Sequence, residues 1–120
     1  MAKNPKYVNI SSVSDLGTFF SRLYRHALVG APYDRQMIEL LGRQKDMECF
    51  PKVLPDFEIA HKTGELAGIY DDGGIFYGKS GDFVLVVMSE NYEQREIAID
   101  KMQKISLAAA KAAVALTKQP

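Results

Sequence analysis

Residues 68–88 read GIYDDGGIFYGKSGDFVLVVM, and this stretch determines the fold class. Two apolar segments, 68–77 and 83–88, flank the turn-forming residues 78–81 (GKSG), a pattern typical of a β-hairpin. A third strand is predicted just upstream, over residues 57–63. Because the connections between these segments are short, we expect the three strands to pair antiparallel.

The two hairpin strands differ in character. The segment FVLVVM, from Phe83 to Met88, is unbroken and rich in β-branched residues, which indicates burial on both faces. The segment 68–77 is interrupted by DDGG at 71–74, which predicts a bulge or bend. We therefore interpret Asp71 and Asp72 as bulge and turn residues, since two carboxylates without a third ligand do not make a metal site.

Helices are predicted on both sides of the strands. Ser12 and Asp15 fit the N-cap and N3 positions of a capping box, and helical spacing continues towards Gly30. Pro32 suits the first turn of a second helix, for which Gly42 is a candidate C-cap. Residues 43–55 are interpreted as a loop.

The C-terminal segment 93–117 is predicted to form one long helix. Its apolar stripe consists of Ala98, Met102, Ile105, Ala109, Ala112 and Leu116. The alanines would allow close approach to a sheet. The element order indicates an α+β fold with two N-terminal helices, a three-stranded antiparallel sheet and a long C-terminal helix. We expect a single domain over residues 1–120, with residues 1–10 disordered.

Composition excludes several classes of function. The chain has 120 residues, 47% of them hydrophobic, and its 15 basic residues balance 15 acidic ones. The chain therefore has no net charge that would favour binding to nucleic acid or to an anionic membrane. One cysteine and two histidines give no basis for a disulfide or a metal site, and no cofactor is expected. Cys49 is interpreted as a half-buried loop thiol.

The N-terminus lacks the apolar core of a signal peptide, and the longest apolar run is too short to span a bilayer. As it stands the chain is expected in the cytoplasm. It would be extracytoplasmic if it were cut from a longer secreted protein.

Lys62, Thr63 and Gly64 lie within the first predicted strand. Glycine packs nothing in a strand, so it often marks a place where another group approaches the backbone. The plainer interpretation is a solvated lysine, a β-favouring threonine and a glycine that begins a turn. His61 shares a strand face with Thr63, so a weak His61–Thr63 base–hydroxyl pair is conceivable.

K-T-G on a strand resembles a signature of the penicillin-recognising serine hydrolases, which include the class A β-lactamases. NISSVSDLGTFFSRLY (9–24) resembles the helix after that family's omega loop. HKTGEL (61–66) and DDGGIFYGKSGDFVLVVMSE (71–90) resemble its third to fifth strands. The similarity extends from about Asn9 to Val114. It implies the C-terminal half of a class A β-lactamase-like fold.

The resemblance implies a substrate-binding role for four residues. Lys62 would supply a positive charge beside the nucleophile and the substrate carboxylate, and the Thr63 hydroxyl would hydrogen-bond that carboxylate. Gly64 would let an acyl group lie against the strand. The Glu65 backbone N–H would be an oxyanion-hole donor. The implied ligands are a β-lactam or a D-Ala-D-Ala-like group.

Other parts of that family's machinery have no counterpart. No serine is followed by lysine three positions later, so the S-x-x-K nucleophile is absent from these 120 residues. The sequences Tyr7-Val8-Asn9 and Ser89-Glu90-Asn91 have the letters of the second signature but lie at the wrong places. We therefore expect no catalytic residue within this chain, and the isolated chain to be inactive.

The resemblance also implies missing partners for the sheet and the last helix, since the family's fifth strand pairs with its first. The strand from Phe83 to Met88 would then be an apolar edge that invites association. A separate N-terminal half or a second copy could cover it. Two hypotheses follow: a segment of a serine hydrolase, or a non-enzymatic module that binds itself or a partner.

Overall fold

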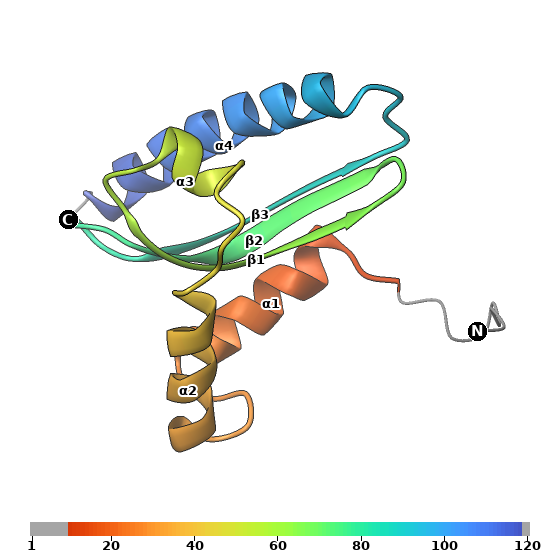
Figure 1. Ribbon diagram of the computed structural model, residues 1–120. Coiled ribbons are helices and arrows are strands. Elements are labelled where there is room, and N and C mark those ends of the chain that lie inside the picture. The colour runs from red at the N-terminus through yellow and green to blue at the C-terminus, as the bar shows by residue number, and fades with distance from the viewer. Residues whose placement is uncertain (1–9, 119–120) are drawn as a thin grey trace, which may run out of the picture.

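The computed structural model describes residues 10–118 (Figure 1). Its sheet has the order β1 (Glu58–Leu66), β2 (Ile69–Tyr77) and β3 (Phe83–Glu90). α1 (Val13–Tyr24) covers one face, and α2 (Ala31–Leu41) projects from the same side. α3 (Phe50–Val53) and α4 (Arg95–Thr117) cover the other face. The predicted α+β arrangement is confirmed, whereas the disorder expected for residues 1–10 falls, except for Ile10, outside the described residues.

β1 and β2 form a tight hairpin. Leu66 pairs with Ile69, so only Ala67 and Gly68 make the connection, and Gly68 has the positive φ of 73° that such a turn requires.

β2 is continuous, so the predicted bulge at residues 71–74 is wrong. Every residue of β2 from Asp71 to Gly74 has a partner in both neighbouring strands. A Cβ on Gly74 would lie 2.5 Å from the carbonyl oxygen of Ala60. The glycines therefore allow close packing across the sheet, and Asp71 and Asp72 are ordinary strand residues.

The turn predicted at 78–81 is confirmed by the bond from Gly81 N–H to the Gly78 carbonyl (3.3 Å). β3 contacts α1 on one face and α4 on the other, as its apolar sequence predicts. Only Val87 of this strand is fully buried, because β3 is an edge strand of the described sheet.

Two hydrophobic clusters lie on the two faces of the sheet. On the α3/α4 side Phe50, Tyr70 and Phe76 are fully buried, together with Cys49. Cys49 is thus a core residue rather than a half-buried loop thiol. On the α1/α2 side the cluster is smaller and contains Phe20, Leu23, Ala60 and Ile75.

The N-terminal helices follow the sequence in part. Ser12 caps α1 by accepting a bond from Asp15 N–H (3.1 Å), as predicted. α1 ends at Tyr24 rather than near Gly30, because His26 takes a positive φ of 57°. Pro32 lies in the first turn of α2 as predicted. The predicted loop 43–55 contains the short helix α3.

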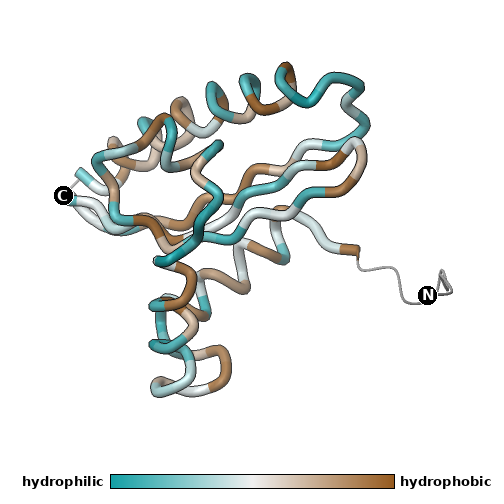
Figure 2. Tube along the Cα trace, viewed as in Figure 1, coloured by the Kyte–Doolittle hydropathy of each residue, from teal (hydrophilic) through white to brown (hydrophobic). Residues whose placement is uncertain are grey.

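The predicted stripe of α4 is wrong in its second half. The buried residues are Ala98, Ile99, Met102, Ser106 and Ala110. Ile105 is 56% exposed and Leu116 67% exposed, so they point away from the sheet. Ser106 satisfies its hydroxyl by donating to the Met102 carbonyl (2.6 Å), which lets a polar residue face the core. Figure 2 shows hydrophobic residues recurring along successive turns of α4.

Candidate functional site

Lys62, Thr63 and Gly64 lie in the middle of β1, as predicted, and their side chains alternate between the two faces. Lys62 and Gly64 share the face of buried Ala60, which packs in the α1/α2 cluster. Lys62 is exposed. Its ammonium group contacts the carbonyl oxygen of Thr63. The charge of Lys62 therefore stays beside the strand on the α1/α2 side.

Thr63 faces the opposite layer and is only 9% exposed. Its neighbour there is Asp46, in the segment between α2 and α3. Burial raises the pKa of Asp46, but hydrogen bonds from the Glu48 N–H and the Tyr70 hydroxyl, with the nearby Thr63 hydroxyl, outweigh it and hold that pKa below its usual value. The Thr63 hydroxyl thus lies on the side of a protein carboxylate whose pKa it helps to lower.

His61 does not pair with Thr63, although both face α3 and α4. Its Nδ1 lies 2.7 Å from Oδ1 of Asp72, and both side chains are buried. Asp72 also accepts the backbone N–H of Phe50 (3.2 Å), at the start of α3. Burial raises the pKa of Asp72, against the opposing effect of the His61 hydrogen bond. This pair fixes α3 against the sheet directly beneath the K-T-G strand.

Glu65 is held by an ion-pair cluster at the end of β1. The Arg95 guanidinium donates to Glu65 (2.6 and 3.0 Å) and to Glu48 (3.1 and 2.5 Å). It also lies over the ring of Tyr70, 5.5 Å from its centroid. The Arg95 hydrogen bond lowers the pKa of Glu65. The Glu65 side chain is thereby tied back to the first turn of α4.

Along β1, the backbone N–H and C=O groups of successive residues point alternately towards β2 and towards the open edge of the sheet. Gln44 donates to the carbonyl of His61 from outside the sheet (3.5 Å), and Lys62 contacts the carbonyl of Thr63. In an antiparallel strand the N–H and C=O of one residue point to the same side. His61 and Thr63 thus face outward, and the same alternation directs the Glu65 N–H outward.

Gly64 leaves open space above the strand. A Cβ built on Gly64 would meet nothing within 4 Å, unlike those of Gly73 and Gly74 in the neighbouring strand. One open region at the edge of β1 is therefore bordered by three groups: Lys62, the backbone of Gly64, and the Glu65 N–H.

The remaining candidates contribute nothing to this region. Tyr7-Val8-Asn9 lies outside the described residues. Ser89-Glu90-Asn91 lies at the end of β3, on the opposite edge of the sheet from β1. Among residues 10–118, no three His, Cys, Asp or Glu side chains gather as a metal ion would require. In the same range, no helix has the length and apolar character to cross a membrane.

A sequence model described as the beta-lactamase enzyme family matches residues 1–113. The chain belongs to this family. No curated protein matches the chain.

Solved structures show the same fold. The β-lactamase from Sphaerobacter thermophilus DSM 20745 superposes with a TM-score of 0.83 at 21% identity, over 95% of this chain and 44% of that one. PBP-A gives a TM-score of 0.78 at 20% identity, and a TLA-1 extended spectrum β-lactamase variant gives 0.79 at 18%. Each of these two matches covers 92% of this chain and 44% of the other. The chain thus spans less than half the length of these structures, and its fold is that of the C-terminal half of a β-lactamase.

Sequence reasoning missed the residues that hold the K-T-G strand in place: Asp46, Asp72 and Arg95. In the sequence, Asp46 lies in the predicted loop and Arg95 lies in the first turn of the predicted C-terminal helix, where a charged residue is ordinary. Asp72 precedes two glycines, and that pattern predicts a bulge. Only the fold shows that the three side chains meet the strand from one side.

Proposed function

We propose that this chain is the K-T-G-bearing segment of a serine β-lactamase-like hydrolase. Its β1 edge would bind a ligand that carries an acyl group and a carboxylate, such as a β-lactam or a D-Ala-D-Ala-like peptide. The nucleophile would come from residues outside these 120, so the isolated chain would not catalyse. The observation that carries this proposal is the open region bordered by Lys62, Gly64 and the outward Glu65 N–H.

Each of these groups has a separate task in the proposal. Lys62 supplies a positive charge that attracts the carboxylate. Gly64 leaves the backbone bare, so an acyl group can lie against it. The Glu65 N–H donates to the oxygen that becomes negative during acyl transfer, where a removed donor typically costs about 10²–10³-fold in rate. Thr63 is buried on the side of Asp46, so its hydroxyl would have to turn towards the ligand to contribute.

The test uses the protein purified from its source without tags. Native mass spectrometry shows whether a chain with S-x-x-K accompanies it, and a fluorescent penicillin reports acylation. We expect no covalent label on the 120-residue chain itself. We expect a label on the serine of the accompanying chain, and Lys62→Ala to slow that labelling about 10²-fold or more. Labelling that is unaffected by Lys62→Ala would overturn the proposal.

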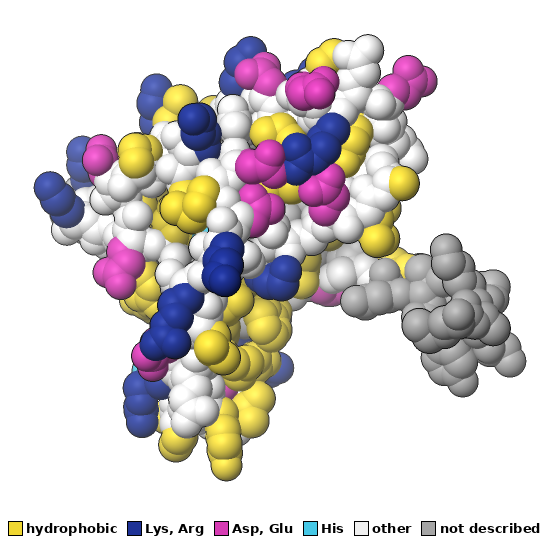
Figure 3. Space-filling model, in the orientation of Figure 1, with side chains coloured by type: hydrophobic (Ala, Val, Ile, Leu, Met, Phe, Trp, Pro, Cys, Tyr) yellow, Lys and Arg dark blue, Asp and Glu magenta, His cyan; other side chains and the backbone are white. Residues whose placement is uncertain are grey.

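A second candidate is a non-enzymatic module that binds itself or a partner. The observation that favours it is the apolar surface on α1, α2 and the loop between them, where Val29, Tyr33 and Leu40 are each more than half exposed. Figure 3 shows hydrophobic side chains gathered at this end of the molecule. A biological activity of the isolated chain that survives Lys62→Ala would support this candidate, and loss of that activity would exclude it.

A further inference from the structure

Arg95, in the first turn of α4, joins three parts of the fold through one side chain. Its Nε and Nη2 atoms donate to the two carboxylate oxygens of Glu65, near the end of β1 (2.6 and 3.0 Å). Its Nη1 and Nη2 atoms donate to the two oxygens of Glu48, before α3 (3.1 and 2.5 Å). The guanidinium also lies over the ring of Tyr70, which is fully buried in β2. Each carboxylate is therefore bound by two nitrogens of one planar group, which fixes its direction as well as its distance.

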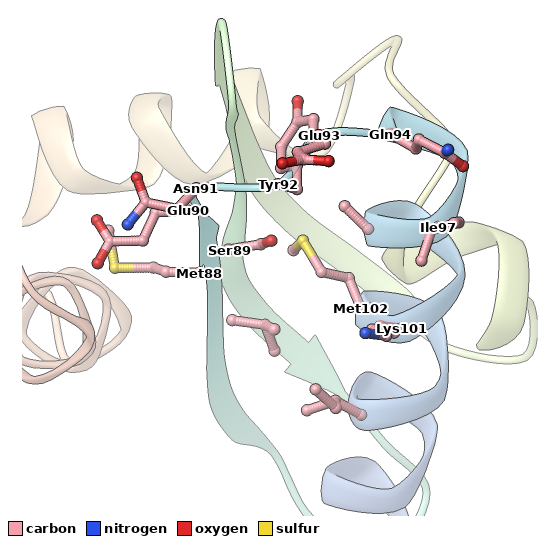
Figure 4. A pocket seen from close by; sticks show the side chains of 13 residues that line it. Met88, Ser89, Glu90, Asn91, Tyr92, Glu93, Gln94, Ile97, Lys101 and Met102 are labelled. Carbon is pink, nitrogen blue, oxygen red and sulfur yellow. The ribbon is translucent and has the colours of Figure 1, made fainter.

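The backbone at Arg95 is held in place by the core. In the next two turns of α4, Ala98, Ile99 and Met102 are buried. On the β3 side, a groove of about 630 Å³ lies between the strand and this end of the helix. Figure 4 shows Ser89 of β3 and Met102 of α4 pointing into this groove from its two sides. Among the described residues, the polar connection from this end of α4 to β1 is therefore made by Arg95.

The segment of β1 that Arg95 binds is the one that carries the Glu65 N–H. This N–H belongs to the peptide group between Gly64 and Glu65. Pairing with Asp71 holds Gly64 on the β2 side, but a Cβ built on Gly64 would meet nothing within 4 Å. The strand ends at Leu66, directly before the turn, where local opening costs little free energy. Of the two residues that share this peptide group, only Glu65 has a side chain, and Arg95 binds both of its oxygens.

We propose that Arg95 is a positioning residue for acyl transfer at the K-T-G strand. The Glu65 side chain faces the α4 layer while its N–H points to the open edge, so Arg95 acts from behind the strand. By binding the side chain, it holds the N–H in the direction in which it donates to the ligand oxygen. This role rests on the proposed function, in which that N–H is an oxyanion-hole donor. Such a donor accelerates the reaction because it is aligned before the negative charge develops.

The arrangement requires arginine rather than lysine at residue 95. The bonds to Glu65 and Glu48 use three nitrogens of one plane, and the Tyr70 ring lies against the face of that plane. A lysine ammonium is a point charge on a flexible stem and cannot reproduce two such forks. Arg95→Lys therefore keeps the positive charge and loses the fixed direction, which separates positioning from a general effect of charge.

The experiment measures acylation of the purified assembly, in which the accompanying chain supplies the serine, at several concentrations of a fluorescent penicillin. We expect Arg95→Ala to lower the limiting rate about tenfold or more and to leave the half-saturating concentration unchanged. Arg95→Lys should be slowed to a similar extent. The final labelled fraction should equal that of the wild type, whereas a merely structural loss would lower that fraction. Lys104→Ala removes another ion pair of α4 and is the matched control, which should acylate at the wild-type rate.

A double-mutant cycle tests whether Arg95 acts through the Glu65 side chain. Glu65→Ala removes that side chain and keeps the backbone N–H. Arg95→Ala should therefore slow the Glu65→Ala protein no further, because residues that act as a unit are not additive. Losses that multiply in the double variant would show that Arg95 acts by another route and would overturn the proposal.

The 120-residue chain alone gives a measurement that needs no catalysis. The backbone NMR order parameter of the Glu65 amide should lie near the value of about 0.85 for rigid backbone in the wild type and fall in Arg95→Ala. The order parameter of Ile75, in the core, should not change. An unchanged value at Glu65 in the variant would overturn the proposal.

The role of Arg95 and the proposed function can fail in different ways. If Lys62→Ala slows labelling and Arg95→Ala does not, the proposed function stands and the role of Arg95 is overturned. If the wild-type assembly is not labelled at all, both are overturned. Slower labelling in both variants, with a raised half-saturating concentration only for Lys62→Ala, would support both.

Discussion

Asp72 accepts hydrogen bonds from both His61 (2.7 Å) and the backbone N–H of Phe50 (3.2 Å), and so joins β1, β2 and α3 beneath the K-T-G strand. Asp72 is 1% exposed. Removing the carboxylate would leave two buried donors, on His61 and on the Phe50 backbone, without an acceptor. A buried donor left unpaired in this way costs more free energy than replacing both partners by apolar groups.

Asp72→Ala is therefore expected to destabilise the fold by about 3–5 kcal/mol. Urea unfolding followed by circular dichroism measures this. Asp71→Ala is the matched control, one position along the same strand and facing the other side. Its loss should be about 1 kcal/mol, since Asp71 is partly exposed and accepts one long bond from Ser89 N–H (3.3 Å). Equal losses for the two variants would show that Asp72 has no special role.

Gly74→Ala should destabilise the protein, whereas Gly64→Ala should not. The new Cβ at residue 74 would lie 2.5 Å from the Ala60 carbonyl oxygen and 2.6 Å from the His61 Cβ, so two strands must separate. Overpacking of this kind costs about 1–3 kcal/mol. At residue 64 the Cβ meets nothing within 4 Å, and alanine restricts the unfolded chain more than glycine does. Thermal unfolding of both variants checks the difference in sign.

Asp34 should make the stability of the protein depend on acid pH. Burial raises its pKa, but hydrogen bonds from the N–H groups of Leu28, Val29 and Gly30 outweigh it and lower the pKa below 3.8. A carboxyl with a depressed folded pKa contributes stability above its unfolded pKa and loses it as the pH falls through the folded pKa.

The free energy of unfolding of the wild type should consequently decrease between about pH 5 and pH 2 more steeply than that of Asp34→Asn. Urea titrations at several pH values provide the measurement. Parallel curves for the two proteins would mean that Asp34 ionises alike in the folded and unfolded states.

Arg95→Ala should weaken the tie between Glu65 and α4 with little effect on the fold. Its side chain is 40% exposed, and partly exposed ion pairs contribute about 1 kcal/mol or less. Amide hydrogen exchange at Leu66, the neighbour of Glu65 whose N–H faces β2, should speed up severalfold, while exchange at Ile75 in the core should not change. Lys104→Ala removes another ion pair of α4, to Asp100, and is the control that should leave exchange at Leu66 unaffected.

Cys49 should be unreactive in the folded protein. It is fully buried, and burial raises the pKa of its thiol to about 12, against the opposing hydrogen bond with Ser106. The thiolate is the nucleophile, so alkylation at pH 8 should be at least 100-fold slower than in urea. Mass spectrometry after timed iodoacetamide treatment follows the reaction. Rapid labelling of the native protein would place Cys49 outside the core.

Local patterns predicted the strands and the starts of the helices, because a cap such as Ser12 or a turn such as Gly78–Gly81 acts within a few residues. Interactions across the fold were harder to predict. The exposed position of Ile105 depends on how α4 is rotated, and that rotation follows from Ser106 and Ala110 packing beside Cys49, more than 50 residues earlier in the chain. For the same reason the sequence indicates Lys62 and Gly64 but not the Asp46 and Asp72 carboxylates behind them.

The two-residue turn at Ala67 and Gly68 has a consequence for ligand size. Because β1 and β2 are joined so tightly, this connection forms no wall above the edge where the Glu65 N–H points. A ligand lying along that edge under the proposed function would extend past Leu66, which is 71% exposed, into water. This end of the site would therefore tolerate bulky substituents, and any discrimination between ligands would have to come from the Lys62 end.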